Sequence, residues 1–183
     1  NEVEQTVDVQ AGVITKVLQN FAEEKNLQYP VDFASSGSSQ IGGNIATNAG
    51  GIKVIRYVLT RDWVLGLTVV TGRGDILKLN KALIKNATGY DFRHLFIGSE
   101  GTLGLIVEAT IALAPAPVMP EVLLLAADKM TDVVQVLTKF RDSVTLNAFE
   151  FFSEAALQHV LRERGKTHPF DEAANFYVLL EFE

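Results

Sequence analysis

Two stretches rich in glycine and small polar side chains constrain this chain more than any other feature. They cover residues 41–51 and 98–104, and each adjoins an apolar run of the kind that forms strands. Glycine adopts positive φ freely and lets a ligand approach the backbone. One such stretch could be a pair of tight turns, but two in one modest domain favour a shared ligand. A large phosphorylated cofactor would suit them.

The residues alone leave the role of the first stretch open. Asn44, Thr47 and Asn48 bring amide and hydroxyl groups to a backbone that could approach a phosphate or a planar ring. The same side chains could instead bond their own backbone in a structural loop. Neither Gly-Lys-Ser/Thr nor GxGxxG occurs. In the second stretch, Glu100 must be exposed, paired or bonded to a ligand, because burying an unpaired carboxylate is costly.

Composition excludes several classes of function. The 183 residues are 48% apolar and 21% charged, which predicts a folded protein of one domain or slightly more. A net charge of -6 argues against nucleic acid as the main partner, since a phosphate backbone requires a basic face. There is no cysteine, and the three histidines lack the i, i+4 spacing of a zinc helix, so no metal site is predicted. No apolar run approaches the roughly 20 residues of a membrane span.

Hydrophobic patterns predict an α+β chain. Residues 34–51 are expected to be irregular or loosely helical, and residues 64–79 to form a hairpin. The other predicted strands cover 6–9, 105–113, 122–127, 146–152 and 176–182, and the predicted helices cover 13–25, 131–140 and 153–164.

A proline pair in residues 114–117 marks the best domain boundary, because it forbids continued helix. Beyond it, Thr131 and Ser153 are predicted helix N-caps. Asp91 and Arg93 are interpreted as part of a solvated face. The helix over 131–140 is expected to turn five apolar side chains inward: Val133, Val134, Val136, Leu137 and Phe140.

Taken together, residues 42–51, 86–91 and 95–104 closely resemble the FAD-linked oxidase family, which has a flavin domain of the vanillyl-alcohol-oxidase or PCMH type. The stretch 86–91, Asn-Ala-Thr-Gly-Tyr-Asp, makes the chain most similar to the members that oxidise D-2-hydroxy acids, D-2-hydroxyglutarate or D-lactate. The resemblance implies that residues 1–117 are the second half of the flavin domain. Residues 118–183 would begin an α+β substrate-binding domain. The chain is therefore expected to be a central fragment of a longer protein.

The resemblance also implies a set of site residues. Arg56, Asn86 and Tyr90 are weaker candidates near the substrate, and the catalytic residues and metal-binding histidines are expected outside the chain. Val58 departs from the family, which usually has glycine after the Arg-Tyr pair. Residues expected to contact FAD are Gly12, Gly42, Gly43, Asn44, Thr47, Asn48, Ala49, Gly50, Glu100, Gly101, Gly104 and Ile106.

The activity implied for the whole protein is oxidation of a D-2-hydroxy acid by hydride transfer to the flavin. Electrons would leave to a quinone, a cytochrome or an electron-transfer flavoprotein, and the parent could be a homodimer. The implied location is the cytoplasm or the inner membrane surface in bacteria, or the mitochondrial matrix in eukaryotes. The fragment alone is expected to be inactive. The alternative is a flavin-free binding or interaction module that retains the fold.

Overall fold

A computed structural model describes residues 1–80, 83 and 85–183. The chain divides into two compact units, Asn1–Ala116 and Pro117–Glu183, and each is described by itself. Positions 81, 82 and 84 lie outside the described residues.

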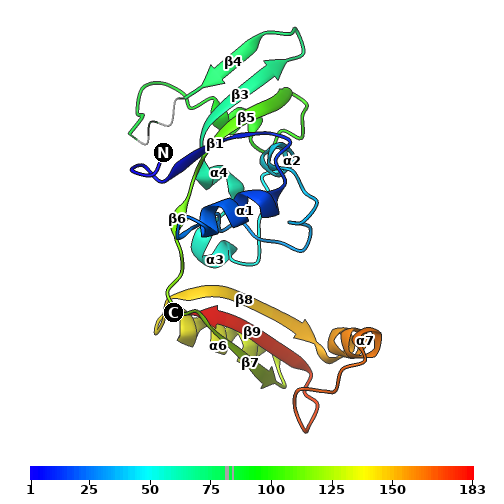
Figure 1. Cartoon of the computed structure of the whole chain (residues 1–183). Helices are drawn as coiled ribbons and strands as arrows, with labels where there is room; N and C mark the ends of the chain where they lie inside the picture. Colours follow the sequence, from blue (N-terminus) through cyan, green and yellow to red (C-terminus); the bar gives the residue numbers. More distant parts are fainter. Residues whose placement is uncertain (81–82, 84) are drawn as a thin grey trace. The chain divides into compact units, whose positions relative to one another are not determined.

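The N-terminal unit is built on an antiparallel four-stranded sheet (Figure 1). The order across the sheet is β1 (Thr6–Gln10), β5 (Gly104–Ala112), β3 (Val64–Thr71) and β4 (Ile76–Leu79). β3 and β4 form the predicted hairpin, which is thereby confirmed. β5 pairs with both β3 and β1, so the segment after the second glycine stretch becomes a central strand.

Helices supply the other half of the core of this unit. Ile41 and Ile45 of α2 and Leu18 of α1 are buried against the apolar face of the sheet. A short ladder joins residues far apart in sequence, β2 (Leu27–Gln28) and β6 (Ala114–Pro115). The helices of this unit, among the described residues, are α1 (Thr15–Glu23), α2 (Ile41–Ala46), α3 (Val54–Tyr57), α4 (Thr60–Trp63) and α5 (Arg93–Phe96).

α2 forms within the segment that was predicted to be irregular or loosely helical. Glycine lowers helix stability by about 1 kcal/mol per residue relative to alanine, and α2 contains two. Tertiary contacts offset that cost: Ile41 and Ile45, four residues apart, are fully buried. The helix entry is also tied down, because the Gly42 N–H donates to the Ala11 carbonyl at 2.8 Å.

The C-terminal unit is an antiparallel three-stranded sheet with two helices (Figure 1). Its order is β7 (Glu121–Ala127), β9 (Phe176–Phe182) and β8 (Leu146–Ser153). The helices α6 (Met130–Arg141) and α7 (Glu154–Arg164) alternate with the strands along the chain. The predicted order of strand, helix, strand, helix, strand is confirmed.

The ends of these helices test the predicted caps. The predicted N-cap at Ser153 is confirmed, because its Oγ accepts the Ala156 N–H at 3.3 Å. The predicted N-cap at Thr131 is wrong, since α6 begins at Met130 and the Asp132 carboxylate accepts the Lys129 N–H at 3.2 Å. Val134 is exposed rather than inward, whereas Val133 is buried.

Val58 adopts a backbone conformation that suits glycine. It ends α3 with φ +53° and ψ −149°, and a β-branched residue at positive φ is a genuine outlier. Such strain costs of order 1–3 kcal/mol. The glycine that the resemblance leads us to expect at this position would adopt this conformation without strain.

We expect Val58→Gly to raise the free energy of unfolding by about 1 kcal/mol. Relief of strain exceeds the entropy that glycine adds to the unfolded chain, roughly 0.4–1 kcal/mol. The valine side chain is half exposed, so little burial is lost. Urea denaturation measures the change. Val58→Ala, which still carries a Cβ, is the control and should gain less; a glycine variant less stable than the parent would contradict the assignment of strain.

Candidate functional site

The first part of the candidate site is the turn after β1, which lies against α2. The Ile41 N–H donates to the Val13 carbonyl at 2.9 Å, and the Gly42 N–H donates to the Ala11 carbonyl. The Ala11 N–H in turn donates to the Val107 carbonyl of β5 at 2.9 Å. Gly12 therefore lies beside the start of α2.

The second glycine stretch is bound to the other end of α2. The Gly98 N–H donates to the Ile45 carbonyl at 3.1 Å, and the Glu100 N–H donates to the Ala46 carbonyl at 2.8 Å. Three residues of the loop, Gly98, Glu100 and Gly101, have positive φ. The fold thus brings together two stretches that are about fifty residues apart in sequence, as a shared ligand would require.

The glycines of these loops fall into two groups. A Cβ added at Gly42 would lie 2.5 Å from the Ala11 Cβ, and one at Gly104 would lie 2.8 Å from the Val70 carbonyl oxygen. Those glycines are required by packing. At Gly12, Gly43 and Gly101 a Cβ would meet no atom within 4 Å. Their Cα faces are open, and a ligand could reach the backbone there.

We call the exposed surface formed by Gly12, Gly43, Thr47, Glu100 and Gly101 the glycine surface. All five residues are exposed. Gly43 and Thr47 lie four positions apart along the α2 segment and so share a face of it. Glu100 is exposed to solvent, which is one of the three possibilities that the sequence left open for this residue.

Most polar side chains of the loops bond within the protein. Asn44 is buried and its amide donates to the Thr15 hydroxyl at 2.6 Å, so this side chain faces the core and not the glycine surface. Thr47 donates to the Gly43 carbonyl at 3.0 Å, and Thr102 donates to the Ser99 carbonyl at 2.7 Å. The structural interpretation therefore holds for these hydroxyls, and the ligand interpretation rests on the backbone.

The remaining predicted cofactor residues lie around the glycine surface. Asn48 has φ +49° and accepts the Arg61 N–H, and the Ala49 carbonyl accepts the Thr60 N–H. Gly50 is exposed, with a Leu59 methyl near its Cα. Ile106 is a buried residue of β5, paired with Val69. Contact between any of these residues and a cofactor stays a prediction.

The three candidate substrate residues lie in different surroundings. Arg56 belongs to α3, where its guanidinium lies 5.1 Å from the centre of the Tyr57 ring. Asn86 and Tyr90 belong to the segment before α5, and Tyr90 is almost fully exposed, with its ring edge toward Phe92. A role in substrate binding stays a prediction for all three.

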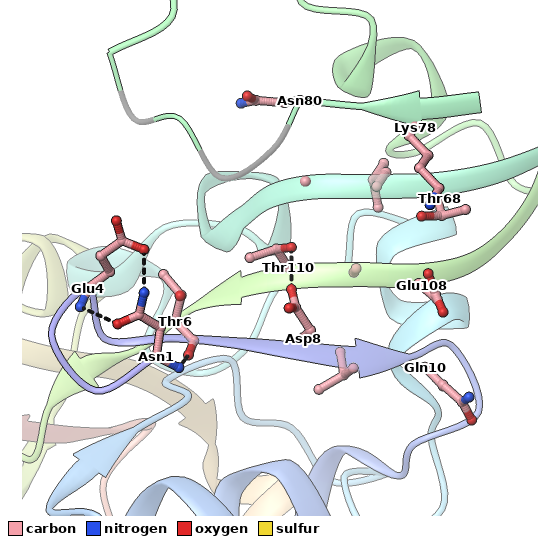
Figure 2. Close-up of a pocket in the computed structure, with 14 residues that line it drawn as sticks. Asn1, Glu4, Thr6, Asp8, Gln10, Thr68, Lys78, Asn80, Glu108 and Thr110 are labelled. Atoms are coloured by element: carbon pink, nitrogen blue, oxygen red, sulfur yellow. Dashed lines mark hydrogen bonds between the residues drawn. The ribbon is translucent and has the colours of Figure 1, made fainter.

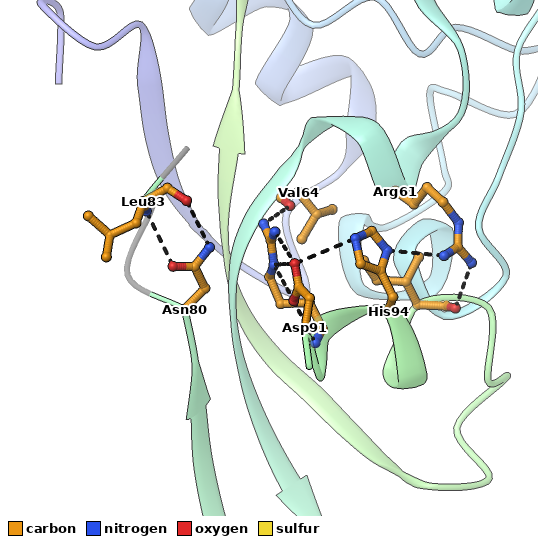
Figure 3. Close-up of polar contacts among 8 residues, drawn as sticks. Arg61, Val64, Asn80, Leu83, Asp91 and His94 are labelled. Atoms are coloured by element: carbon orange, nitrogen blue, oxygen red, sulfur yellow. Dashed lines mark hydrogen bonds and ion pairs between the residues drawn. The ribbon is translucent and has the colours of Figure 1, made fainter. Parts of the chain in front are cut away.

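Asp91 and Arg93 form an ion pair that sequence reasoning missed. The Arg93 Nε lies 2.9 Å from the Asp91 Oδ1, and Arg93 Nη1 donates to the Val64 carbonyl at 2.6 Å (Figure 3). The side chain of Arg93 is only 12% exposed, so the predicted solvated face is wrong at this residue. The guanidinium that donates to Asp91 holds the pKa of that carboxyl below its usual value. The pair fixes α5, and with it the start of the second glycine stretch.

The opposite face of the sheet carries a concavity of about 590 Å³ (Figure 2). Its polar side chains alternate along their strands with residues of the core. Asp8 accepts the Thr110 hydroxyl at 2.6 Å, and Lys78 and Glu108 also line the space. A mixed polar lining is usual for the solvated face of an antiparallel sheet, and no ligand class follows from it.

A hydrogen-bonded cluster in the C-terminal unit also escaped sequence reasoning. The buried Tyr177 donates to the Glu154 carboxylate at 2.6 Å, and His168 Nε2 lies 3.1 Å from the Tyr177 oxygen. The tyrosine donor lowers the pKa of Glu154, and burial raises the pKa of Tyr177. Tyr177 also accepts the Ala174 N–H, so the cluster fastens the segment after α7 to β9.

Among the residues that the structure describes, no group of three or more His, Cys, Asp or Glu side chains is placed to hold a metal ion. In the same part of the chain, no helix has both the length and the apolar character needed to cross a membrane.

Comparison with known proteins shows what this chain is similar to. Residues 1–80 match the family described as FAD binding domain. The whole chain is 58% identical to D-2-hydroxyglutarate dehydrogenase of Stutzerimonas stutzeri and 56% identical to the enzyme of that name from Xanthomonas citri pv. viticola. It spans 39% and 38% of their lengths. These similarities confirm the resemblance to the FAD-linked oxidase family found in the sequence.

The fold has a counterpart among solved structures. A structure of alkyldihydroxyacetonephosphate synthase matches the whole chain and 35% of its own chain, with a TM-score of 0.79 and 23% sequence identity. At that identity the likeness concerns the fold alone. The assignment of residues 1–117 and 118–183 to a flavin domain and a substrate-binding domain stays a prediction.

Proposed function

We propose that this chain is part of an FAD-dependent dehydrogenase that oxidises a D-2-hydroxy acid, with D-2-hydroxyglutarate as the favoured substrate. The observation that carries the proposal is the glycine surface, where three open Cα faces from separate segments lie around one short helix. The names of the two bacterial relatives support the choice of substrate.

The residues of this chain would bind the cofactor and leave its chemistry undisturbed. FAD, when bound, supplies the acceptor for the hydride that leaves the carbinol carbon of the substrate. Gly12, Gly43 and Gly101 would let it approach the backbone closely. Backbone amides at such loops can stabilise negative charge without a charged side chain. The base that accepts the hydroxyl proton is expected outside this chain.

Gly43→Leu tests whether the glycine surface binds FAD, in a protein of the relatives' length that contains this chain. Leucine is a good helix former and would meet no atom of the described structure at its Cβ, so the fold should be retained. Its side chain would project over the glycine surface, and we expect FAD to bind at least roughly tenfold more weakly. Equilibrium dialysis measures the affinity.

The control is Ala155→Leu, which introduces the same side chain at an exposed position of α7 in the other unit. It should leave the FAD affinity unchanged. Equal affinity in the Gly43 variant and the parent would show that the glycine surface does not hold the cofactor. A parent that binds no FAD would leave the flavin-free module as the remaining function.

Substrate class is tested by the flavin spectrum of the same protein. Adding D-2-hydroxyglutarate should bleach the visible absorption band of the flavin, whereas the L enantiomer should not. Comparison with D-lactate separates the two substrates that the sequence left open. Reoxidation assays with a quinone, a cytochrome or an electron-transfer flavoprotein then identify the acceptor. A flavin that no D-2-hydroxy acid reduces would refute the proposal.

A further inference from the structure

Arg61 connects the two glycine stretches. It belongs to α4, which is anchored to the first stretch because Thr60 is fully buried and its hydroxyl donates to the Ala49 carbonyl at 2.7 Å. The Arg61 N–H donates to the Asn48 side-chain oxygen at 3.0 Å. The backbone of Arg61 is therefore held by the segment that directly follows α2.

The guanidinium of Arg61 reaches the second stretch. Its Nη2 donates to the Ile97 carbonyl at 3.2 Å, immediately before Gly98 (Figure 3). Its Nη1 lies 3.1 Å from His94 Nδ1 in α5. Contacts here are close, because a Cβ added at Gly98 would lie 3.4 Å from the Asn48 Cβ and 3.6 Å from Arg61 Nη2.

The two nitrogen groups of the guanidinium act on two different partners at once. A planar fork can donate in two fixed directions, whereas the ammonium of lysine is a single point charge on a flexible stem. Backbone bonds from Gly98 and Glu100 to α2 hold the loop. Arg61 also holds Ile97, the residue just before the loop, which restrains the start of the loop further.

We propose that Arg61 is a positioning residue that holds residues 98–103 against α2 in the conformation that binds the cofactor. This role rests on the proposed function, and Arg61 itself does not belong to the glycine surface. A loop that is already ordered does not lose further conformational entropy when the ligand binds. Loss of the Arg61 guanidinium should therefore weaken ligand binding without removing any contact between the protein and the ligand.

Arg61→Lys is the main test, because it keeps the positive charge and most of the apolar stem. In the 183-residue chain, hydrogen exchange should show the Glu100 amide exchanging roughly tenfold faster, with the overall unfolding midpoint nearly unchanged. Arg61→Ala should have a larger effect. Arg73→Lys is the matched control, since Arg73 lies exposed in the turn between β3 and β4 and pairs only loosely with Asp75 at 3.7 Å. Unchanged exchange at Glu100 in Arg61→Lys would overturn the proposal.

The second measurement is FAD affinity in the protein of the relatives' length. Arg61→Lys should weaken binding roughly tenfold and alter the shape of the bound flavin bands, while Arg73→Lys does neither. Faster loop exchange with unchanged FAD affinity would refute a positioning role. If the unsubstituted protein binds no FAD, the proposed function fails, yet the exchange measurement still decides whether Arg61 fixes the loop.

Discussion

Replacing Gly51 by alanine is expected to lower the free energy of unfolding by about 3 kcal/mol. A Cβ at this position would lie 2.3 Å from the carbonyl oxygen of Asp32 and 2.7 Å from its nitrogen. Both are backbone atoms, so no side-chain rotation can relieve the contact. The chain itself would have to move, and the hydrogen bond from the Ile52 N–H to the Asp32 carbonyl, 3.0 Å long, would be strained or lost.

Gly43→Ala is the matched control for this prediction. Its Cβ would meet no atom within 4 Å, and alanine is the better helix former, so this variant should gain up to about 1 kcal/mol. Urea denaturation of the two variants gives the comparison. Because the substitutions are chemically identical, the opposite signs would separate a glycine required by packing from one whose Cα is open. Similar small effects in both would contradict the close approach at Gly51.

The contrast between these two glycines explains how much of the site could be predicted from sequence. The glycine-rich stretches themselves marked the region, and their meeting around α2 is what a shared ligand required. Sequence could not tell which glycine is open and which is packed, because that depends on segments distant in the chain. Asp32 approaches Gly51 and Ala11 approaches Gly42 only in the folded unit.

The same limit applies to side-chain direction. The hairpin of β3 and β4 was predictable because alternation and a turn are local signals. Asn44, in contrast, was expected to line the cofactor and instead donates to Thr15, since the buried Ile41 and Ile45 fix the rotation of α2. The spacing of those two isoleucines was the available signal. For Arg93, no local pattern revealed that its guanidinium would donate a hydrogen bond to a carbonyl of β3.

A buried tyrosine beneath the first glycine stretch gives the second large effect. Tyr29 is 2% exposed, and among buried side-chain polar atoms of the described residues its hydroxyl oxygen has no hydrogen-bond partner. Burial raises the pKa of Tyr29 to about 12, and the neighbouring Thr60 offsets only part of that shift. Ionisation of this phenol therefore disfavours the folded state.

The sign of the pH dependence follows from proton binding. In the unfolded chain tyrosine ionises near pH 10, whereas in the folded chain it keeps its proton to about pH 12. Between those values the folded state binds more protons, so stability falls as pH rises. Two pKa units correspond to roughly 2.7 kcal/mol, lost between about pH 10 and pH 12.

We therefore expect Tyr29→Phe to unfold at a distinctly higher pH than the parent. Near pH 7 the variant should be at least as stable as the parent, because the substitution removes a buried hydroxyl that has no hydrogen-bond partner. Tyr90→Phe is the control, since Tyr90 is exposed and its ionisation should not affect folding. Circular dichroism along an alkaline titration measures the midpoints. If Tyr29→Phe and Tyr90→Phe both unfold at the same pH as the parent, ionisation of Tyr29 does not limit alkaline stability.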